Sequence, residues 1–431
     1  MSHVHLTSWT GIPPPRPYRA VTIEWTQQNP FPDRDALVLP RGYGRSYGDG
    51  CLPCDTAILT HRLDRIRSFD TERGIIAVEA GISLGELLRI TIPRGWVLPV
   101  LPGTRAVSIG GAIANDIHGK SHHWAGTIGR WIERFELVRS DGRALIAPTE
   151  QSELFSATIG GLGLTGIVTW AELRLHPCPS AQMETLTIPF ASLDEYFALV
   201  PEIEREGNYV VAWCDLSRKG RVRGMIHVSQ FADVQCDGGG KTSLPPVRQW
   251  QFRLPLSIMS RPAVRILNAL RWISAPRQHR GEYTRIFFPL DRLPWNGLFG
   301  RRGFFQLQAV LPQESEVHLL RSILCRLWDV HLPLPLVVLK HFASIPSPGM
   351  LSFPMAGTSI AVDVPNTARA RSTLETIIAE IAESGGRVYP AKDVLMRPEQ
   401  FQHMYPQWVQ LERYRDPRFC SQFWQRVTGC R

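Results

Sequence analysis

The chain has 431 residues, of which 44% are hydrophobic and 20% charged, as in soluble globular proteins of two or three domains. It carries 48 Lys and Arg against 39 Asp and Glu, a net charge of +9, and this modest excess favours an anionic substrate or surface. No run of 18 uncharged apolar residues and no secretory signal pattern is visible, so we expect no transmembrane helix or signal peptide. The eight cysteines indicate free thiols in a reducing compartment. We therefore expect a cytoplasmic protein or a peripheral one at the inner membrane.

The first part of the chain combines short strands with glycine turns. Apolar, β-branched runs that end at Gly, Asp or Pro predict strands over residues 36–40, 57–60, 74–81, 135–142 and 166–177. A helix is predicted over 83–95, with Ser83 as its N-cap and Glu86 as the capping-box partner.

A second helix is predicted over 149–161. Thr149 or Ser152 is its expected cap and Gly160 its expected stop. The glycine-rich stretch 160–166 that follows contains the spacing G-x-G-x-x-G. In a dinucleotide-binding fingerprint a strand precedes that spacing and a helix follows it. Here the order is inverted, so we predict a turn that lines a cofactor site and reject a Rossmann site.

Residues 179–386 have a different texture, with longer elements. Strands are predicted over 209–217, 223–231, 303–312 and 358–365, and helices over 314–329 and 368–386. This alternation predicts an α+β domain built on an antiparallel sheet. From Arg387 the chain returns to short polar and aromatic segments. We therefore predict three segments, 1–178, 179–386 and 387–431.

The stretch 248–280 is rich in arginine and has no Asp or Glu. Apolar residues recur at helical spacing beside Arg265 and Arg271. One interpretation is an ordinary surface helix packed on the core. The other is a mobile basic flap that meets a membrane surface or an anionic lipid.

The strongest local signal is the sequence LPRGYGRSYGDG over 39–50. Four glycines within nine residues leave backbone N–H groups exposed and permit positive φ angles. Such a loop can wrap a pyrophosphate, and Arg41 and Arg45 add positive charge. We predict a ligand-binding loop.

A second small-residue segment spans 97–129 and ends in three histidines and a lysine. Its PGT and SIGGAIA stretches also allow close backbone approach to a ligand. His118, His122 and His123 raise the possibility of a metal site. The glycine-rich flanks and the missing H-E-x-x-H pattern favour cofactor contact instead. Similarly, the lone C-x-x-C of Cys51 and Cys54 lacks the second pair of a zinc ribbon, and two incidental thiols are favoured. We predict no metal.

Three candidates stand in the second half of the chain. Gln306 and Gln308 share one face of a predicted strand because side chains alternate, and paired amides suit hydroxyl recognition. Lys340 and Lys392 each interrupt apolar or small surroundings, although a lone lysine is usually a surface residue.

Several of these motifs occur in the order known from one family. They are RGYGRSYGDG, VLPGTR, SIGGAIANDIHGKSHH, ELFSATIGGLGLTGI, LSFP, VYPAKD and FQHMYP. The chain resembles the decaprenylphosphoryl-β-D-ribose 2′-oxidase family, within the vanillyl-alcohol-oxidase-type flavoproteins, over nearly its full length. The likeness is strong over 36–176 and 385–420 and looser over 179–340.

The resemblance implies an α+β fold. An FAD-binding domain of the PCMH type is made from the first part and the C-terminal tail, with an antiparallel-sheet substrate domain inserted between them. It implies FAD bound non-covalently. The implied cofactor contacts are Arg41, Gly42, Tyr43, Gly44, Arg45, Ser46, Tyr47, Gly48, Gly103, Thr104, Ser108, Ile109, Gly110, Gly111, Ala114, His118, Gly119, Lys120, His122, Ile167 and Tyr389.

The reaction implied is hydride transfer from the ribose of a polyprenyl-phosphate-linked sugar, which leaves a 2-keto sugar. A separate short-chain reductase would complete the epimerisation to arabinose. Lys392, Tyr47 and His118 are the implied catalytic residues. The implied substrate contacts are Gln306, Gln308, Lys340, Phe342, Ser359, Ala361 and Lys392.

The sequence also departs from the family. Ala361 stands where mycobacterial members carry a cysteine beside the flavin, and Ser359 stands where they carry Asn. His341 replaces a usually apolar residue. These changes leave open a different sugar or lipid, another sugar, aldonolactone or polyol oxidase of the superfamily, and a non-catalytic basic membrane-binding module. We expect no nucleic-acid partner; the basic stretch 248–280 would handle the lipid phosphate at a membrane.

Overall fold

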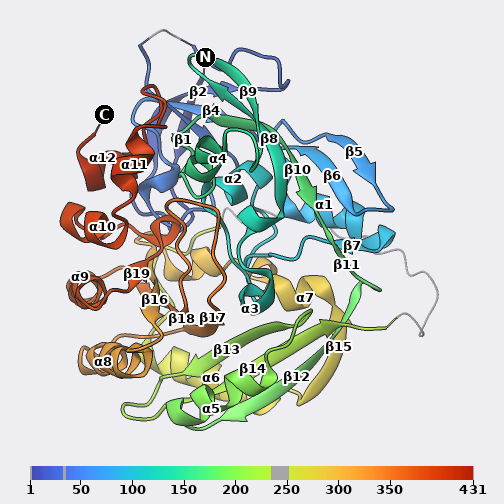
Figure 1. Cartoon of the computed structure of the whole chain (residues 1–431). Coiled ribbons are helices and arrows are strands. Elements are labelled where there is room, and N and C mark those ends of the chain that lie inside the picture. Colours follow the sequence, from blue (N-terminus) through green and yellow to red (C-terminus); the bar gives the residue numbers. More distant parts are fainter. Residues whose placement is uncertain (1, 33–34, 234–251, 431) are drawn as a thin grey trace.

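A computed structural model describes residues 2–32, 35–233 and 252–430 (Figure 1). Residues 248–251 of the basic stretch therefore lie outside the described residues. The first part of the chain builds two sheets. The smaller has the order β1 (Ser2–Leu6), β2 (Arg16–Thr22), β4 (Thr56–Leu59), β3 (Val38–Arg41), with β4 parallel to both β2 and β3. The larger is antiparallel, with the order β5 (Ile66–Asp70), β6 (Ile75–Glu79), β10 (Ile167–Arg174), β8 (Ile132–Arg139), β9 (Gly142–Ile146).

Short helices connect these strands. They are α1 (Leu84–Thr91), α2 (Ile109–Ala114), α3 (His122–Ala125) and α4 (Ser152–Thr158), and a two-stranded ribbon pairs β7 (Trp96–Val97) with β11 (His176–Pro177). Ser83 caps α1 as predicted, because its hydroxyl accepts the Glu86 N–H at 3.1 Å. The Glu86 carboxylate does not complete the capping box; it accepts two bonds from Arg89 instead.

The predicted cap of α4 was wrong. Gln151, with φ of 56°, occupies the N-cap position and makes no side-chain cap bond. A tight turn in which Ala147 pairs with Glu150 comes directly before it and sets this backbone conformation. Ser152 is consequently the first residue of the helix. Gly160 stands directly after the C-cap with φ of 70°, as expected of a helix stop.

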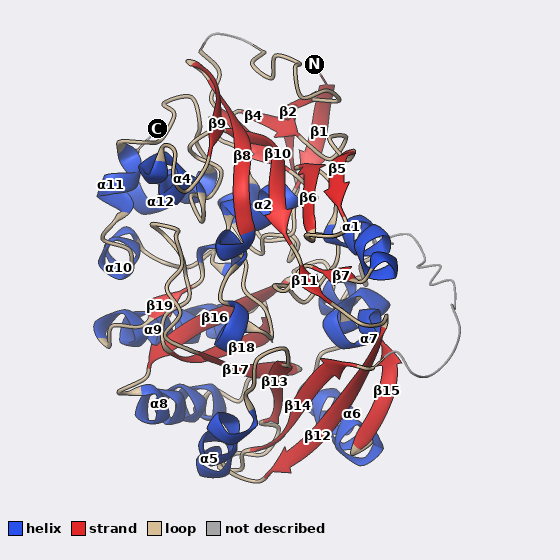
Figure 2. Cartoon of the chain, turned by 45° about the vertical axis from the view of Figure 1, so that its right-hand side comes forward, coloured by secondary structure: helices blue, strands red, loops and turns tan. Residues whose placement is uncertain are grey.

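The middle of the chain forms one eight-stranded sheet, which lies below the five-stranded sheet in Figure 2. Its order is β15 (Gln278–Glu282), β12 (Gln182–Phe190), β14 (Arg223–Phe231), β13 (Tyr209–Asp215), β17 (Leu336–Phe342), β18 (Gly357–Pro365), β16 (Phe304–Pro312), β19 (Arg387–Val388). Every strand pair is antiparallel. The α+β class and the antiparallel sheet are thereby confirmed.

Helices cover one face of this sheet. A single apolar core joins the strands to α5 (Leu193–Ile203), α8 (Glu316–Asp329) and α9 (Ala368–Glu383). Side chains alternate across each strand, so the remaining positions of the same strands point away from that core. α6 (Arg261–Ser274) and α7 (Tyr283–Phe287) complete this part.

The C-terminal tail returns to the first sheets. It contains α10 (Pro398–Met404), α11 (Trp408–Glu412) and α12 (Gln422–Thr428). Val38 of β3 donates its N–H to the Arg418 carbonyl at 2.7 Å and accepts the Cys420 N–H at 3.1 Å. The tail and the first part thus form one body, as Figure 1 shows. The division at 178 and 386 stays a prediction, because β19 at the start of the tail still pairs with β16. In the described part of the chain, every helix is too short or too polar to cross a membrane.

Candidate active site

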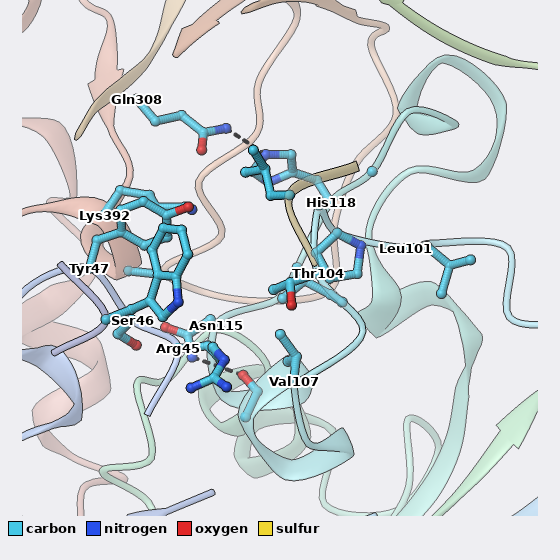
Figure 3. Close-up of a pocket in the computed structure, with 18 of the residues that line it drawn as sticks. Arg45, Ser46, Tyr47, Leu101, Thr104, Val107, Asn115, His118, Gln308 and Lys392 are labelled. Atoms are coloured by element: carbon cyan, nitrogen blue, oxygen red, sulfur yellow. Dashed lines mark hydrogen bonds between the residues drawn. The ribbon is translucent and has the colours of Figure 1, made fainter. Parts of the chain in front are cut away.

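A cavity of about 490 Å³ lies between the open face of the eight-stranded sheet and the first part of the chain. Much of its wall comes from the glycine loop 40–51, the segment 101–120, and side chains of β12, β13, β14, β16, β17 and β18, and residues of α6, β15 and α7 add to it. Tyr389 and Lys392 add the 389–392 turn, whose last residues form a short 3-10 helix. Figure 3 shows Tyr47 and Lys392 on one side of this space and Thr104 and His118 on the other.

The turn that carries Lys392 is fixed to the glycine loop. Tyr47 donates its N–H to the Ala391 carbonyl at 2.8 Å. A Cβ at Gly48 would lie 1.7 Å from the carbonyl oxygen of Asp393, so only glycine permits this approach. Arg426 of α12 then binds both Asp49 and Asp393 at 2.8–2.9 Å. The tail therefore holds Lys392 at a defined place beside the loop.

Lys392 stands over an aromatic face. Its Nζ lies 3.1 Å from the centre of the Tyr47 ring, and Tyr47 is buried. Burial lowers the pKa of Lys392 well below its usual value, while the Asp363 carboxylate works in the opposite direction. Burial therefore favours the neutral amine of Lys392 more than in an exposed lysine.

Asp363 is fully buried beneath this lysine, on β18. It accepts bonds from Trp295 Nε1 at 2.7 Å and from Gln306 Nε2. Burial raises the pKa of its carboxyl to about 6. Asp363 thus orients Gln306 and places one negative charge near Lys392.

His118 occupies the opposite wall. Its Nε2 lies 2.7 Å from Gln308 Nε2, the bond drawn in Figure 3. An amide nitrogen donates, so in this orientation Nε2 accepts and the ring proton is on Nδ1, a buried atom without a partner among the described residues. Burial lowers the pKa of His118 well below its usual value, which keeps the ring neutral between Phe342, Phe353 and Tyr389.

The wall is cationic throughout. It includes Arg41, Arg45, Lys120, Arg271, Arg285, Lys340 and Lys392, and none of its described residues is Asp or Glu. Burial lowers the pKa of Lys340 to about 8 and that of Lys120 to about 7. Such a wall suits ligands that bring their own negative charge.

The structure brings most of the predicted site residues to this wall. They are Arg41, Gly42, Tyr43, Gly44, Arg45, Ser46, Tyr47, Gly103, Thr104, Ser108, Gly110, Gly111, Ala114, His118, Gly119, Lys120, Gln306, Gln308, Lys340, Ala361, Tyr389 and Lys392. Leu162, Gly163 and Gly166 of the predicted cofactor-lining turn join them. Arg41 fixes the glycine loop in place, because its guanidinium donates to the carbonyls of Cys51 and Thr7.

Six predicted residues stand behind the wall instead. They are Gly48, Ile109, His122, Ile167, Phe342 and Ser359. His122 packs against Phe342 with ring centres 4.3 Å apart, and Phe342 in turn packs against His118. Ile167 belongs to a small core with Val38 and Phe419. In these positions they support the wall residues by packing and do not face the cavity.

The prediction from the residues missed Asp363, Trp213 and Arg271. Asp363 is the single acidic residue in the predicted strand 358–365. An acidic residue alone in an otherwise uncharged strand was the sequence signal that could have identified it. Trp213 and Arg271 reach the wall together, with the guanidinium 4.4 Å from the ring centre. Their meeting depends on how α6 crosses the sheet, which no local pattern encodes.

Two further expectations concern metal and thiols. Among the described residues, no group of three or more His, Cys, Asp or Glu side chains is arranged to hold a metal ion. Cys51 is a free thiol in the structure. Cys54 Sγ lies 3.3 Å from Cys420 Sγ of the tail, not beside Cys51.

Comparison with known proteins shows what the chain is similar to. Residues 30–147 match the family model of an FAD binding domain. The chain is 33% identical over 402 residues to decaprenylphosphoryl-beta-D-ribose oxidase of Mycolicibacterium smegmatis, which covers 88% of this chain and 86% of that protein. It is 31% identical over 342 residues to an uncharacterized protein of Streptomyces coelicolor, covering 75% and 92% of the two chains. A putative D-arabinono-1,4-lactone oxidase of Neurospora crassa is 30% identical over 143 residues, 32% of this chain and 25% of that protein.

Proposed function

Because the chain belongs to the decaprenylphosphoryl-β-D-ribose oxidase family of FAD-dependent oxidoreductases, we propose that it oxidises the 2-hydroxyl of a polyprenyl-phosphate-linked ribose to the 2-keto sugar. The observation that carries the proposal is that Lys392, Tyr47, Gln306, Gln308 and His118 line one cavity. These groups come from four distant parts of the chain.

The cavity fits FAD. Gly103 is on the wall, and a Cβ there would meet no atom of the protein within 4 Å. Packing within the protein therefore does not require glycine at this position, whereas close approach of a cofactor would. The segments 42–47 and 103–111 would hold the cofactor, with Arg45 near its phosphates. Bound FAD supplies a hydride acceptor. We expect a non-covalent complex.

The protein's own groups would prepare the hydroxyl. Oxidation of an alcohol removes a hydride from carbon and a proton from oxygen. The lowered pKa of Lys392 suits its neutral amine to accept that proton. Gln306, held by Asp363, and Gln308, held against His118, offer amide groups for the neighbouring hydroxyls. The half-buried Lys340 would add a donor on the same wall.

A membrane location would suit a lipid-linked substrate. α6 turns Ile266, Leu267, Leu270 and Ile273 outward, with up to 81% of a side chain exposed. Arg261 precedes this face, and Arg277 and Arg280 follow it. An apolar stripe flanked by arginines suits an anionic bilayer surface. We propose a cytoplasmic or peripheral enzyme at the inner membrane that passes its keto product to a separate short-chain dehydrogenase/reductase.

The test compares substrates. The flavin-loaded protein is assayed with farnesylphosphoryl-β-D-ribose, free ribose, an aldonolactone and a polyol. We expect turnover with the lipid-linked ribose at a kcat/KM at least tenfold above that for the others. Higher activity on the free sugar or lactone would reject the lipid-linked substrate, and absence of any flavin would reject an enzyme of this family.

A further inference from the structure

The cations of the cavity wall come from two places: Arg41 and Arg45 belong to the glycine loop, whereas Lys120, Arg271 and Lys340 belong to other segments. In the first group, burial lowers the pKa of Arg45, Asp291 works in the opposite direction, and Arg41 lowers the pKa further. In the second group, burial lowers the pKa of Lys120, and Lys340 and Arg271 lower it further. The glycine loop accounts for the first group. In the second, the resemblance implied a cofactor contact for Lys120 and a substrate contact for Lys340, but no individual contact for Arg271.

This second group lies where α6 meets the open face of the sheet. Arg271 is solvent-exposed but lies on the same side of α6 as the buried Asn268, three residues before it, and covers the Trp213 ring at 4.4 Å. Beside it on the wall are His227 and Ser229 of β14 and Thr185 of β12. Lys120 enters from the first part of the chain and donates to the Ile286 carbonyl.

The group has excess positive charge. No ion pair joins Lys120, Arg271 or Lys340 to a carboxylate among the described residues, and no described acid lies on the wall. Burial is the main cause that lowers the pKa of His227 to about 3, and Arg271 and Lys120 act in the same direction. Burial likewise lowers the pKa of Lys120, and Lys340 and Arg271 add to that effect. Neighbouring cations that disfavour one another in this way are stabilised by an anion between them.

Hydrogen-bond donors accompany the charge. The hydroxyls of Thr185 and Ser229 lie 2.9 Å apart and are buried. A guanidinium, an ammonium and two hydroxyls are the groups that bind phosphate oxygens in proteins. Leu267, one turn before Arg271 on α6, is exposed, so apolar surface continues from this place toward the solvent.

We propose that Arg271, Lys120, Thr185 and Ser229 form a subsite for the phosphate of a lipid-linked substrate, whose apolar chain leaves along α6. The inference rests on the proposed function for the identity of the ligand. It adds to that function a fixed anchor: the phosphate bound here would place the attached sugar toward Lys340 and Lys392.

The test measures binding without turnover. Flavin-loaded protein is titrated calorimetrically with farnesyl phosphate, farnesol and inorganic phosphate. None of these carries the ribose, so the result does not depend on whether the ribose is oxidised. We expect farnesyl phosphate to bind at least tenfold tighter than farnesol, and tighter than inorganic phosphate.

The variants Arg271→Gln and Lys120→Met should each weaken farnesyl phosphate about tenfold and leave farnesol unchanged. Arg265→Gln is the matched control, because Arg265 is on the same helix but donates to the Ser217 carbonyl outside the cavity. Flavin content reports whether each variant is folded. Unchanged phosphate affinity in both flavin-loaded variants would overturn the subsite. Equal affinity for inorganic and farnesyl phosphate would overturn the lipid assignment.

Discussion

The Nζ of Lys392 lies 3.1 Å from the centre of the Tyr47 ring, and these two residues are 345 positions apart in the sequence. The contact joins the RGYGRSYGDG loop to the VYPAKD segment, two of the motifs by which the chain resembles one family. It depends on the Tyr47–Ala391 backbone bond and on the Arg426 bridge between Asp49 and Asp393. Lys392 is therefore positioned by the tail and the glycine loop together.

Replacing Lys392 by alanine should abolish most turnover while the protein keeps its flavin. A proton acceptor contributes about 10²- to 10⁴-fold to rate, so we expect kcat to fall by that order. Stopped-flow flavin reduction and flavin absorbance check the two parts. Lys219→Ala is the control, since Lys219 is an exposed partner of Asp329. A variant that reduces its flavin at the wild-type rate would remove Lys392 from the chemistry.

Asp363→Asn should shift the pH profile of kcat/KM. The Asp363 charge raises the pKa of Lys392, so its removal lowers that pKa further. The neutral amine of Lys392 is then present at lower pH, so the acidic limb of the kcat/KM profile moves to lower pH. Trp295→Phe serves as control because it removes one bond to Asp363 but no charge. A limb that stays in place, or moves to higher pH, would contradict the assignment of Lys392 as proton acceptor.

Gly48→Ala should damage the site through the backbone. Its Cβ would meet the Asp393 carbonyl at 1.7 Å, which forces the Lys392 turn away from the loop. We expect a loss in kcat/KM on the order of 10²-fold, as for other small displacements of catalytic groups. Gly281→Ala, whose nearest neighbour would be 3.9 Å away, should retain full activity. Full activity in Gly48→Ala would show that the turn position is not critical.

Lys120 should make stability depend on pH. Its pKa is about 7 in the folded protein against 10.5 ordinarily, so the unfolded chain binds more protons between these values. Stability then increases as pH rises from 7 to 10. Lys120→Met should raise the apparent Tm of the flavin-loaded protein at pH 7, by on the order of 1 °C, and this difference should vanish near pH 10. Calorimetry at pH 7 and pH 10 measures the difference in Tm between the variant and the wild type. A Tm difference that does not change with pH would contradict a lowered pKa of Lys120 in the folded protein.

The outer face of α6 should bind membranes. The double variant Leu270→Ser, Ile273→Ser should sediment less with vesicles of anionic lipid, with an affinity lower by on the order of tenfold. Vesicles of neutral lipid should bind the wild type weakly, because the arginines then have no partner. Val409→Ser, at another exposed apolar position, is the control. Equal sedimentation of all forms would reject this face as the contact.

The sequence could predict most elements because their signals are local. The strands around the glycine loop and the long helices α8 and α9 are where periodicity predicts them. The cap of α4 was mispredicted because a turn of four residues precedes it. Ser83 was found because its hydroxyl and its backbone partner are three residues apart.

The site could be predicted only in part. Lys392 was singled out by its motif, whereas Asp363 pairs with Gln306 through strand register, which requires the sheet. Arg271 was recognised as one charge in a basic stretch. That its side chain points inward, and that of Ile273 outward, depends on the packing of Val264 and Asn268.

The most direct test of the central claim is anaerobic mixing of the flavin-loaded protein with farnesylphosphoryl-β-D-ribose, unlabelled or carrying deuterium at C2, while flavin absorbance is followed. We predict that the substrate bleaches the flavin in a single turnover and that deuterium at C2 slows the bleaching severalfold. Bleaching that is insensitive to deuterium at C2, or that occurs only with free sugars, would contradict oxidation of the 2-hydroxyl of a lipid-linked ribose.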